Sequence, residues 1–173
     1  MEKQQSFTIS VYTENNIGLL NRVSAIFLKR HINIESLTSS QSEIEQVNRF
    51  VIVADMTLTQ ATKIVAQLEK QIEVIRAYAH TDEQTIYQES ALFKVAADSF
   101  FDIAELQEII KNNHASILNA NREFFVIEKT GRRIETEQLY QDLKPYNLLQ
   151  FIRSGRISVS KTPMNISEML NAF

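Results

Sequence analysis

Residues 7–40 read FTISVYTENNIGLLNRVSAIFLKRHINIESLTSS, and the spacing of their apolar side chains changes twice. Apolar and polar residues alternate over 7–13, which is the period of a half-buried β-strand. Over 19–31 the apolar residues instead recur every three or four positions, which predicts an amphipathic helix. Residues 32–41 again have strand character and become polar towards their end. The stretch therefore predicts a strand, a helix and a second strand, in that order.

The same order continues and is then repeated in the second half of the chain. The apolar run 50–54 predicts a central strand, Thr59 is placed to cap a second helix, and 72–78 predicts a fourth strand. In the second half we expect strands at 90–97, 116–120, 122–129 and 148–160, and helices at 102–112 and 134–143. Pro145 ends the last helix because proline lacks a backbone donor, and Gly155 marks a bulge or break in the last strand.

The order βαββαβ is typical of the ferredoxin-like fold, in which two helices pack on one face of an antiparallel sheet. We therefore predict an α+β protein with two such units: a first domain at 1–80, a linker at 81–88 and a second domain at 89–173. The other face of each sheet needs cover, and association with a second copy in a symmetric dimer would supply it. The fold alone does not indicate a function.

The composition of the 173-residue chain excludes several classes of function. The chain contains no cysteine, which removes disulfides, thiolate metal sites and cysteine nucleophiles. Lys and Arg number 18 and Asp and Glu 21, so the net charge is −3, and the two halves differ little in charge. Neither half has the basic excess that nucleic acids or anionic membranes require. No apolar run approaches about 18 residues, so we expect a cytoplasmic protein without a membrane segment.

The sequence lacks the spacings of a catalytic or metal site. His31, His80 and His114 are far apart, and no two His, Asp or Glu residues have a recognised ligand spacing. His31 and His114 fall at predicted helix ends, where a cation complements the helix dipole. Carboxylate pairs such as Glu135 and Glu137 are expected to be solvated. We therefore predict no catalytic residue and no metal ligand, which disfavours a stand-alone enzyme.

RNA binding also occurs among βαββαβ domains, and the third strand argues against it here. An RNA-recognition motif stacks bases on aromatic side chains of that strand, within a basic segment that contains glycine. Residues 48–54 read NRFVIVA, with one aromatic residue and no glycine. We therefore expect no nucleic-acid partner.

The loop ENNIG, between the first strand and the first helix, has two interpretations. In the structural one, Asn15 or Asn16 caps the helix and Gly18 allows a tight turn. In the functional one, an uncovered helix N-terminus offers N–H groups to a carboxylate, and Gly18 lets a small ligand approach the backbone. The Asn15 amide can both donate to and accept from a zwitterionic amino acid. Ile17 and Leu19 would then provide an apolar wall for a branched side chain.

Two segments around this loop resemble a known family. ENNIGLLNRVSAIF at 14–27 and HINIESLTSS at 31–40 are similar to the ACT domain that begins the small, regulatory subunits of acetolactate synthase (acetohydroxyacid synthase). The family pattern is E-N-x-x-G-x-L-x-R-V, a helix, and then Y-N-I-E-S-L. Residues 153–155, Arg-Ser-Gly, are similar to a late R-S-G segment of the same family. His31 departs from the pattern, since the family usually has glycine or an aromatic residue at that position.

The resemblance implies a non-catalytic subunit that binds valine, or a related branched-chain amino acid, at the interface of two ACT domains. Carried onto this sequence, Asn15, Gly18 and Leu19 of one chain would meet Asn33 and Ile34 of its neighbour in a homodimer. Asn33 also has a purely structural interpretation, as a turn residue at the start of a strand.

The resemblance further implies a role in the feedback control of branched-chain amino-acid synthesis. The subunit would activate a large catalytic subunit and inhibit it when valine is bound, and the second domain would contact that partner. Thiamine diphosphate, Mg and FAD are then expected on the catalytic subunit, and no cofactor is expected on this chain. An ACT-type amino-acid sensor that regulates another enzyme is the alternative function.

Overall fold

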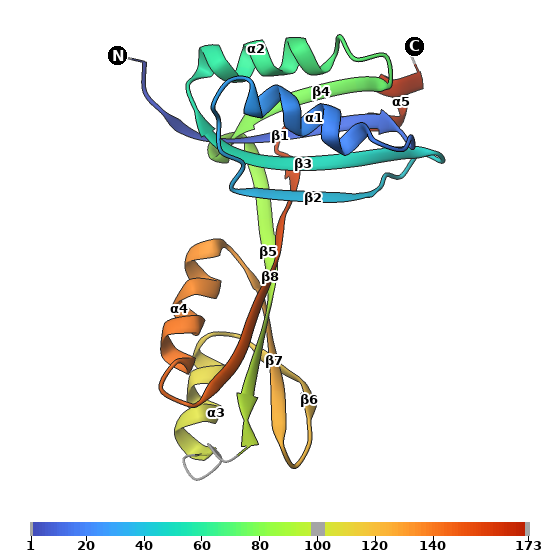
Figure 1. The fold of residues 1–173 in the computed structure, drawn as a ribbon. Helices are drawn as coiled ribbons and strands as arrows, with labels where there is room; N and C mark the ends of the chain where they lie inside the picture. Colours follow the sequence, from blue (N-terminus) through green and yellow to red (C-terminus); the bar gives the residue numbers. More distant parts are fainter. Residues whose placement is uncertain (1, 98–102, 172–173) are drawn as a thin grey trace. The chain divides into compact units, whose positions relative to one another are not determined.

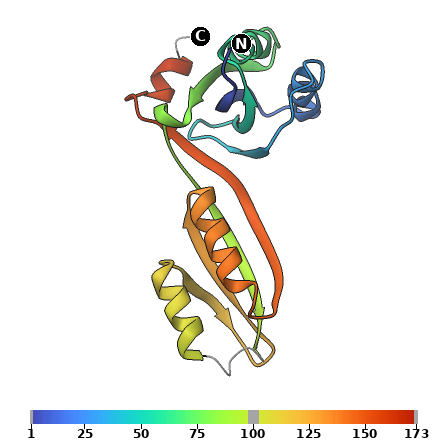
Figure 2. The same cartoon turned by 90° about the vertical axis from the view of Figure 1, so that its left-hand side faces the viewer.

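The computed structural model describes residues 2–97 and 103–171 and divides them into two compact units. One unit contains the chain up to Tyr87 together with the segment from Arg156 onward, and the other contains Gln88–Gly155. Each unit has its own four-stranded sheet, with two helices packed on one face (Figure 1 and Figure 2). The predicted α+β fold with two ferredoxin-like units is confirmed.

The first unit follows the order βαββαβ. Its elements are β1 (Gln5–Glu14), α1 (Leu19–Leu28), β2 (Ser36–Gln41), β3 (Val47–Met56), α2 (Leu58–Leu68) and β4 (Val74–Thr81). The strand order is β2-β3-β1-β4, which leaves β2 and β4 at the edges of the sheet. Phe7, Ile9 and Val11 alternate along β1, so the period of two places all three on the helix-covered face. There they form a core with Phe27 of α1 and Leu68 of α2.

The second unit repeats this order. After the short 3-10 helix η1 (Asp82–Gln84), its elements are β5 (Thr85–Ala96), α3 (Ile103–Asn112), β6 (Ser116–Ala120), β7 (Phe124–Gly131), α4 (Arg133–Leu143) and β8 (Leu148–Ser160), and α5 (Ile166–Asn171) follows. The strand order is β6-β7-β5-β8, and Phe93, Ile127 and Leu139 lie in the core. Gly155 has φ 80°, so the predicted break in the last strand is a left-handed residue within β8. Asp102, which starts the predicted third helix, lies outside the described residues.

Two local features differ from the sequence-based expectation. We predict a linker over 81–88, but only η1 lies between β4 and β5. Residues from Thr85 onward already belong to β5, and Thr85 is 4% exposed. In this part of β5 the buried residues Thr85 and Glu89 are polar, whereas Ile86 is 59% exposed, so the usual pattern of buried apolar residues is missing. Helix α2 is capped by Thr57 and not by Thr59. Gln60 donates from its N–H to the Thr57 hydroxyl, and its side chain accepts from the Thr57 N–H, which makes a capping box.

The helix-free face of the first sheet is covered by residues 156–171, which we call the C-terminal segment. On this face of β1, Thr8, Ser10 and Tyr12 are at most 7% exposed. Leu170 of α5 packs against Tyr12. The sequence places this segment in the second domain and expects cover from a second copy, whereas the structure groups the segment with the first unit. The six-residue helix α5 is too short to show a clear helical period in the sequence.

Candidate functional site

The loop between β1 and α1 leaves the start of the helix without a side-chain cap. Gly18 is the N-cap residue, and no side chain among the described residues accepts a hydrogen bond from the helix N-terminus there. Gly18 has φ 83°, a conformation that glycine adopts without a steric penalty, whereas a Cβ atom added there would meet nothing within 4 Å. The glycine is therefore required by its backbone conformation and not by crowding. The first N–H groups of α1 remain available to an anionic group.

Asn15 is exposed and is held in the loop by the first residues of β3 and by Gln46, which precedes that strand. Its side-chain oxygen accepts a hydrogen bond from the Asn48 amide at 2.9 Å, and its backbone N–H donates to the carbonyl of Gln46 at 3.2 Å. Neither Asn15 nor Asn16 caps α1, because the Asn16 amide instead donates to the carboxylate of Glu14. The structure thus rules out the capping interpretation of this loop.

The apolar surface of the loop comes from side chains that differ in part from the expected ones. Leu19 is 3% exposed and belongs to the core of its own unit, so only its backbone can reach a ligand. Ile17 is fully exposed and Leu20 is 44% exposed. The helical period explains why Leu19 is buried and Leu20 is exposed, since Leu19 lies on the same face of α1 as the buried Val23.

Asn33 and Ile34 lie in the connection between α1 and the edge strand β2. Asn33 is exposed, and its amide donates to the carboxylate of Glu35 at 2.8 Å. Ile34 is half-buried and packs against the core of the first unit. Both residues therefore lie beside an edge strand whose last three residues are exposed.

A single chain does not bring the two halves of the expected site together. Gly18 stands at the N-terminal end of α1, and Asn33 follows its C-terminal end (Figure 1). Helix α1 has 10 residues, which corresponds to a length of about 15 Å. A free amino acid is far shorter than this helix. One ligand can therefore contact both groups only if they come from different chains.

Arg22 on α1 is occupied by an ion pair and is not a free cation for this site. Its guanidinium pairs with Glu73, which immediately precedes β4. Hydrogen bonds from the Glu73 backbone N–H and from Arg22 lower the pKa of the Glu73 carboxyl. The groups that remain for a carboxylate at this end of α1 are thus the helix N–H groups.

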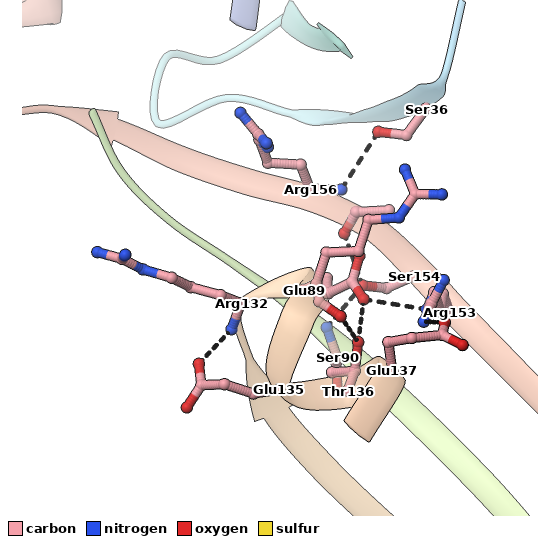
Figure 3. Close-up of polar contacts among 12 residues, drawn as sticks. Ser36, Glu89, Ser90, Arg132, Glu135, Thr136, Glu137, Arg153, Ser154 and Arg156 are labelled. Atoms are coloured by element: carbon pink, nitrogen blue, oxygen red, sulfur yellow. Dashed lines mark hydrogen bonds and ion pairs between the residues drawn. The ribbon is translucent and has the colours of Figure 1, made fainter. Parts of the chain in front are cut away.

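A second polar cluster surrounds Arg153 in the second unit (Figure 3). Its Nε lies 3.1 Å from a carboxylate oxygen of Glu89, and its Nη2 lies 2.5 Å from one of Glu137. Thr136 donates a hydrogen bond to the same oxygen of Glu89, and the guanidinium lies 4.8 Å from the centre of the Phe151 ring. The cluster connects β5, α4 and β8. Because two carboxylates share the positive charge of Arg153, the cluster offers no unpaired cation to a ligand.

The sequence indicates only part of this cluster. The R-S-G resemblance singles out Arg153 in the sequence, whereas the sequence predicts that Glu137 is solvated. Glu137 instead pairs with Arg153, and hydrogen bonds from Gln141 and then Arg153 lower the pKa of its carboxyl. Glu135 accepts a hydrogen bond from the backbone N–H that precedes α4. Sequence reasoning misses Glu89, although a carboxylate at an inward position of an alternating strand is a signal for a buried ion pair.

Neither a metal centre nor a membrane span is found in the described part of the chain. Among residues 2–97 and 103–171, no three His, Asp or Glu side chains are grouped so that they could hold a metal ion. Within the same residues, no helix combines the length and the apolar character needed to cross a bilayer.

Comparison with known proteins yields one consistent family. A family model described as the AHAS small subunit-like ACT domain matches residues 9–76, and one described as the small subunit of acetolactate synthase matches residues 88–162. The acetolactate synthase small subunit of Mycobacterium bovis is 33% identical over 162 residues, which cover 94% of this chain and 96% of that protein. The Bacillus subtilis small subunit is 31% identical over 154 residues, which cover 88% and 89%.

A solved structure shows the same likeness across both units. The crystal structure of the acetolactate synthase small subunit from Thermotoga maritima superposes with a TM-score of 0.83 at 25% sequence identity. The match covers 92% of this chain and 99% of that one. Both the fold and the order of the two units are therefore similar to those of that protein.

Proposed function

We propose that this chain senses valine, on the premise that it belongs to the family of acetolactate synthase small subunits. As a member of that family it is a non-catalytic regulatory subunit, and its partner is a catalytic large subunit. Valine, or a related branched-chain amino acid, binds between the first units of two chains in a homodimer. Its binding mediates feedback inhibition of a catalytic subunit that this chain otherwise activates, in valine, leucine and isoleucine biosynthesis. The cytoplasmic location and the cofactors of the large subunit remain predictions.

The observation that carries this proposal is the separation of the two candidate groups along α1. Two chains that associate through β2 and α1 around a two-fold axis run these elements antiparallel, so the start of one α1 lies against the end of the other. This arrangement joins Gly18 of one chain to Asn33 of its partner. The exposed end of β2 supports it, because an edge strand with unpaired backbone groups is suited to pairing with a second strand.

The groups that would meet in this crevice match the parts of a zwitterionic amino acid. The uncapped N–H groups of α1 suit the carboxylate, which a helix N-terminus also favours electrostatically. The amide oxygens of Asn15 and Asn33 can accept hydrogen bonds from the ammonium group. The exposed side chain of Ile17 and the half-buried Ile34 provide the apolar surface for a branched side chain.

Regulation follows if valine has different affinities for two arrangements of the dimer. A ligand at an interface between chains meets this condition, since any change in the interface changes its contacts. A coupling of about 1–3 kcal/mol between the amino acid and the catalytic subunit is typical of such systems.

We propose further that the second unit contacts the catalytic subunit. Leu92 lies on the helix-free face of the second sheet, since its neighbour Phe93 is in the core, and it is 37% exposed. Ile152 lies on the same face, since Phe151 stacks on Phe93, and it is 51% exposed. The equivalent face of the first sheet is buried under the C-terminal segment. An uncovered apolar sheet face supports a protein partner there.

The test is a thermal-shift titration of the purified full chain with each branched-chain amino acid, combined with co-purification with the large subunit. Valine at 100 times its dissociation constant is expected to add about 2.7 kcal/mol to the free energy of unfolding and to raise Tm. If the chain captures the large subunit but its Tm does not change with valine, leucine or isoleucine, its role as a small subunit stands and the proposed amino-acid binding is wrong.

A further inference from the structure

A pocket of about 330 Å³ opens on the helix-free face of the first unit's sheet, away from α1 and α2. Its walls come from β1, β3 and β4 on one side and from the C-terminal segment on the other. The sheet side contributes Tyr12, Arg49, Tyr78 and His80, and Glu43 lies in the connection that precedes β3. Pockets that bind small molecules have volumes of about 300–1,000 Å³, so this one is large enough for a small metabolite.

Of the described residues that line this pocket, Arg49 is the only Lys or Arg. Its Nη2 donates hydrogen bonds to the hydroxyl of Ser10 at 3.0 Å and to the carbonyl of Ser158 at 2.7 Å. Among the described residues, no carboxylate lies within 4.0 Å of its guanidinium, and its buried Nε has no hydrogen-bond partner. A guanidinium carries five N–H donors, so part of this group remains available for a bidentate contact with a carboxylate.

Aromatic side chains surround this cation and include a second buried polar group. The Tyr78 ring lies 6.4 Å from that of Tyr12 and 6.3 Å from that of His80. The Arg49 guanidinium lies 5.6 Å from the centre of the Tyr12 ring. The Tyr78 hydroxyl is buried and has no hydrogen-bond partner in the described part of the chain. Buried polar groups are almost always hydrogen-bonded, so two orphaned groups in one pocket indicate a ligand with acceptor atoms.

Near neutral pH, Arg49 supplies the positive charge of the pocket. Burial raises the pKa of the Tyr12 and Tyr78 hydroxyls, and burial followed by the nearby Arg49 lowers the pKa of His80. These three side chains are therefore uncharged at pH 7. Glu43, which is exposed, is the one carboxylate among the described residues of the lining.

We propose that this pocket is a second ligand site, which binds a small carboxylate with an apolar body. Arg49 pairs with the carboxylate, the Tyr78 hydroxyl donates to it, and the Tyr12 and Tyr78 rings contact the apolar part. Amino acids and keto acids share this chemistry, and Glu43 is placed to favour the former by contacting an ammonium group. The site lies within one chain, so it is independent of the crevice between two chains.

The proposal is tested on the full chain with valine, with ketoisovalerate, which lacks the ammonium group, and with isobutylamine, which lacks the carboxylate. Binding is followed by calorimetry and by the NMR signals of the Tyr12 and Tyr78 rings. We expect both carboxylates to shift these signals, and isobutylamine to leave them unchanged. Valine binding more tightly than ketoisovalerate would identify the ligand as an amino acid, and the reverse would identify a keto acid. If neither carboxylate shifts the ring signals, the proposal is wrong.

Three variants connect binding to the named groups. Arg49→Gln should weaken carboxylate binding in the pocket by about 10- to 100-fold. Because Arg49 also holds Ser158, Tyr78→Phe provides a milder change that removes only the orphaned hydroxyl, and it should weaken binding about three- to tenfold. Arg30→Gln, on the helical side, is the matched control and should bind as the wild type does. Unchanged affinity in a folded Tyr78→Phe or Arg49→Gln chain would contradict the proposal.

One further variant separates this pocket from the interface crevice. Asn33→Ala removes a group of the proposed crevice and does not touch the pocket. The ring shifts of Tyr12 and Tyr78 should therefore persist in Asn33→Ala and disappear in Arg49→Gln. Loss of the ring shifts in a folded Asn33→Ala chain would show that they report on the crevice, and would overturn the second site.

Discussion

His31, three residues after the end of α1, and His114, two residues after the end of α3, occupy equivalent positions in the two units, and both have left-handed backbones with φ 54° and 51°. In each case the histidine N–H donates to the carbonyl three residues before it. The next residue donates to the carbonyl five residues before it, from Ile32 to Phe27 and from Ala115 to Ile110. This pair of bonds is the Schellman motif, whose left-handed position usually holds glycine.

The first prediction concerns the backbone strain of a non-glycine residue in this left-handed position. His31→Gly should raise the free energy of unfolding by about 0.5–1 kcal/mol, because relief of left-handed strain of about 1–2 kcal/mol exceeds the entropic cost of glycine. Urea denaturation measures the change. His80→Gly is the control, since His80 lies in the regular strand β4 and its replacement should destabilise the chain. A destabilised His31→Gly chain would show that the imidazole makes a compensating contact.

The second prediction addresses the interface site. Asn33→Ala should leave the stability of the chain within about 0.5 kcal/mol of wild type, because the side chain is exposed. It should weaken valine binding in the crevice at least about tenfold, since it removes an acceptor for the ammonium group. Inhibition of the reconstituted synthase by valine, measured beside Asn119→Ala as an exposed control, checks the result. Full inhibition of the Asn33→Ala enzyme would remove Asn33 from the site.

The third prediction concerns Gly18, where conformation and access can be separated. Gly18→Val should cost about 1–2 kcal/mol, because a branched residue is strained at φ 83° even though its Cβ meets open space. Valine binding should be lost while the dimer persists in gel filtration, since the new side chain covers the helix N-terminus. Gly18→Asn is the control for strain, because asparagine tolerates this conformation. Equal valine affinity in the Gly18→Val and wild-type chains would place the carboxylate elsewhere.

The fourth prediction tests the Arg153 cluster. Arg153→Met leaves Glu89 without its cation, with the Glu89 side chain 10% exposed, and should cost about 2–3 kcal/mol. The double variant Arg153→Met/Glu89→Gln should cost less than the sum of the single changes, because the buried charge is then removed as well. Urea denaturation of all three variants gives this comparison, with the exposed Arg122→Met as control. Additive costs would show that the pair is not coupled.

The elements of the fold could be predicted from local patterns, whereas contacts between distant segments could not. Period-two alternation in β1 and the helical period in α1 are properties of neighbouring residues, so the sequence alone indicates them. The burial of Leu19 follows from the same helical period, so the sequence alone indicates that its side chain faces the core and not a ligand. By contrast, the cover of Tyr12 by Leu170 and the pairing of Glu89 with Arg153 join residues that are far apart in the chain. Arg49 was missed for this reason, since its main-chain partner Ser158 is more than a hundred residues away.

The last prediction uses the pKa of His80, which is lowered by burial and then by Arg49. In the unfolded chain His80 has an ordinary histidine pKa of about 6.5, so its imidazole binds a proton more readily there than in the folded chain. The stability that the neutral imidazole contributes is therefore complete above about pH 6.5 and is lost as the pH falls through the folded pKa. His80→Gln should lose less stability than wild type between about pH 7.5 and pH 5.5, as measured by urea denaturation. The lowered carboxyl pKa values of Glu73 and Glu137 lie below this window and do not contribute. The exposed His31→Gln is the control, and equal pH dependence of His80→Gln and wild type would show that the His80 proton is bound equally well in both states.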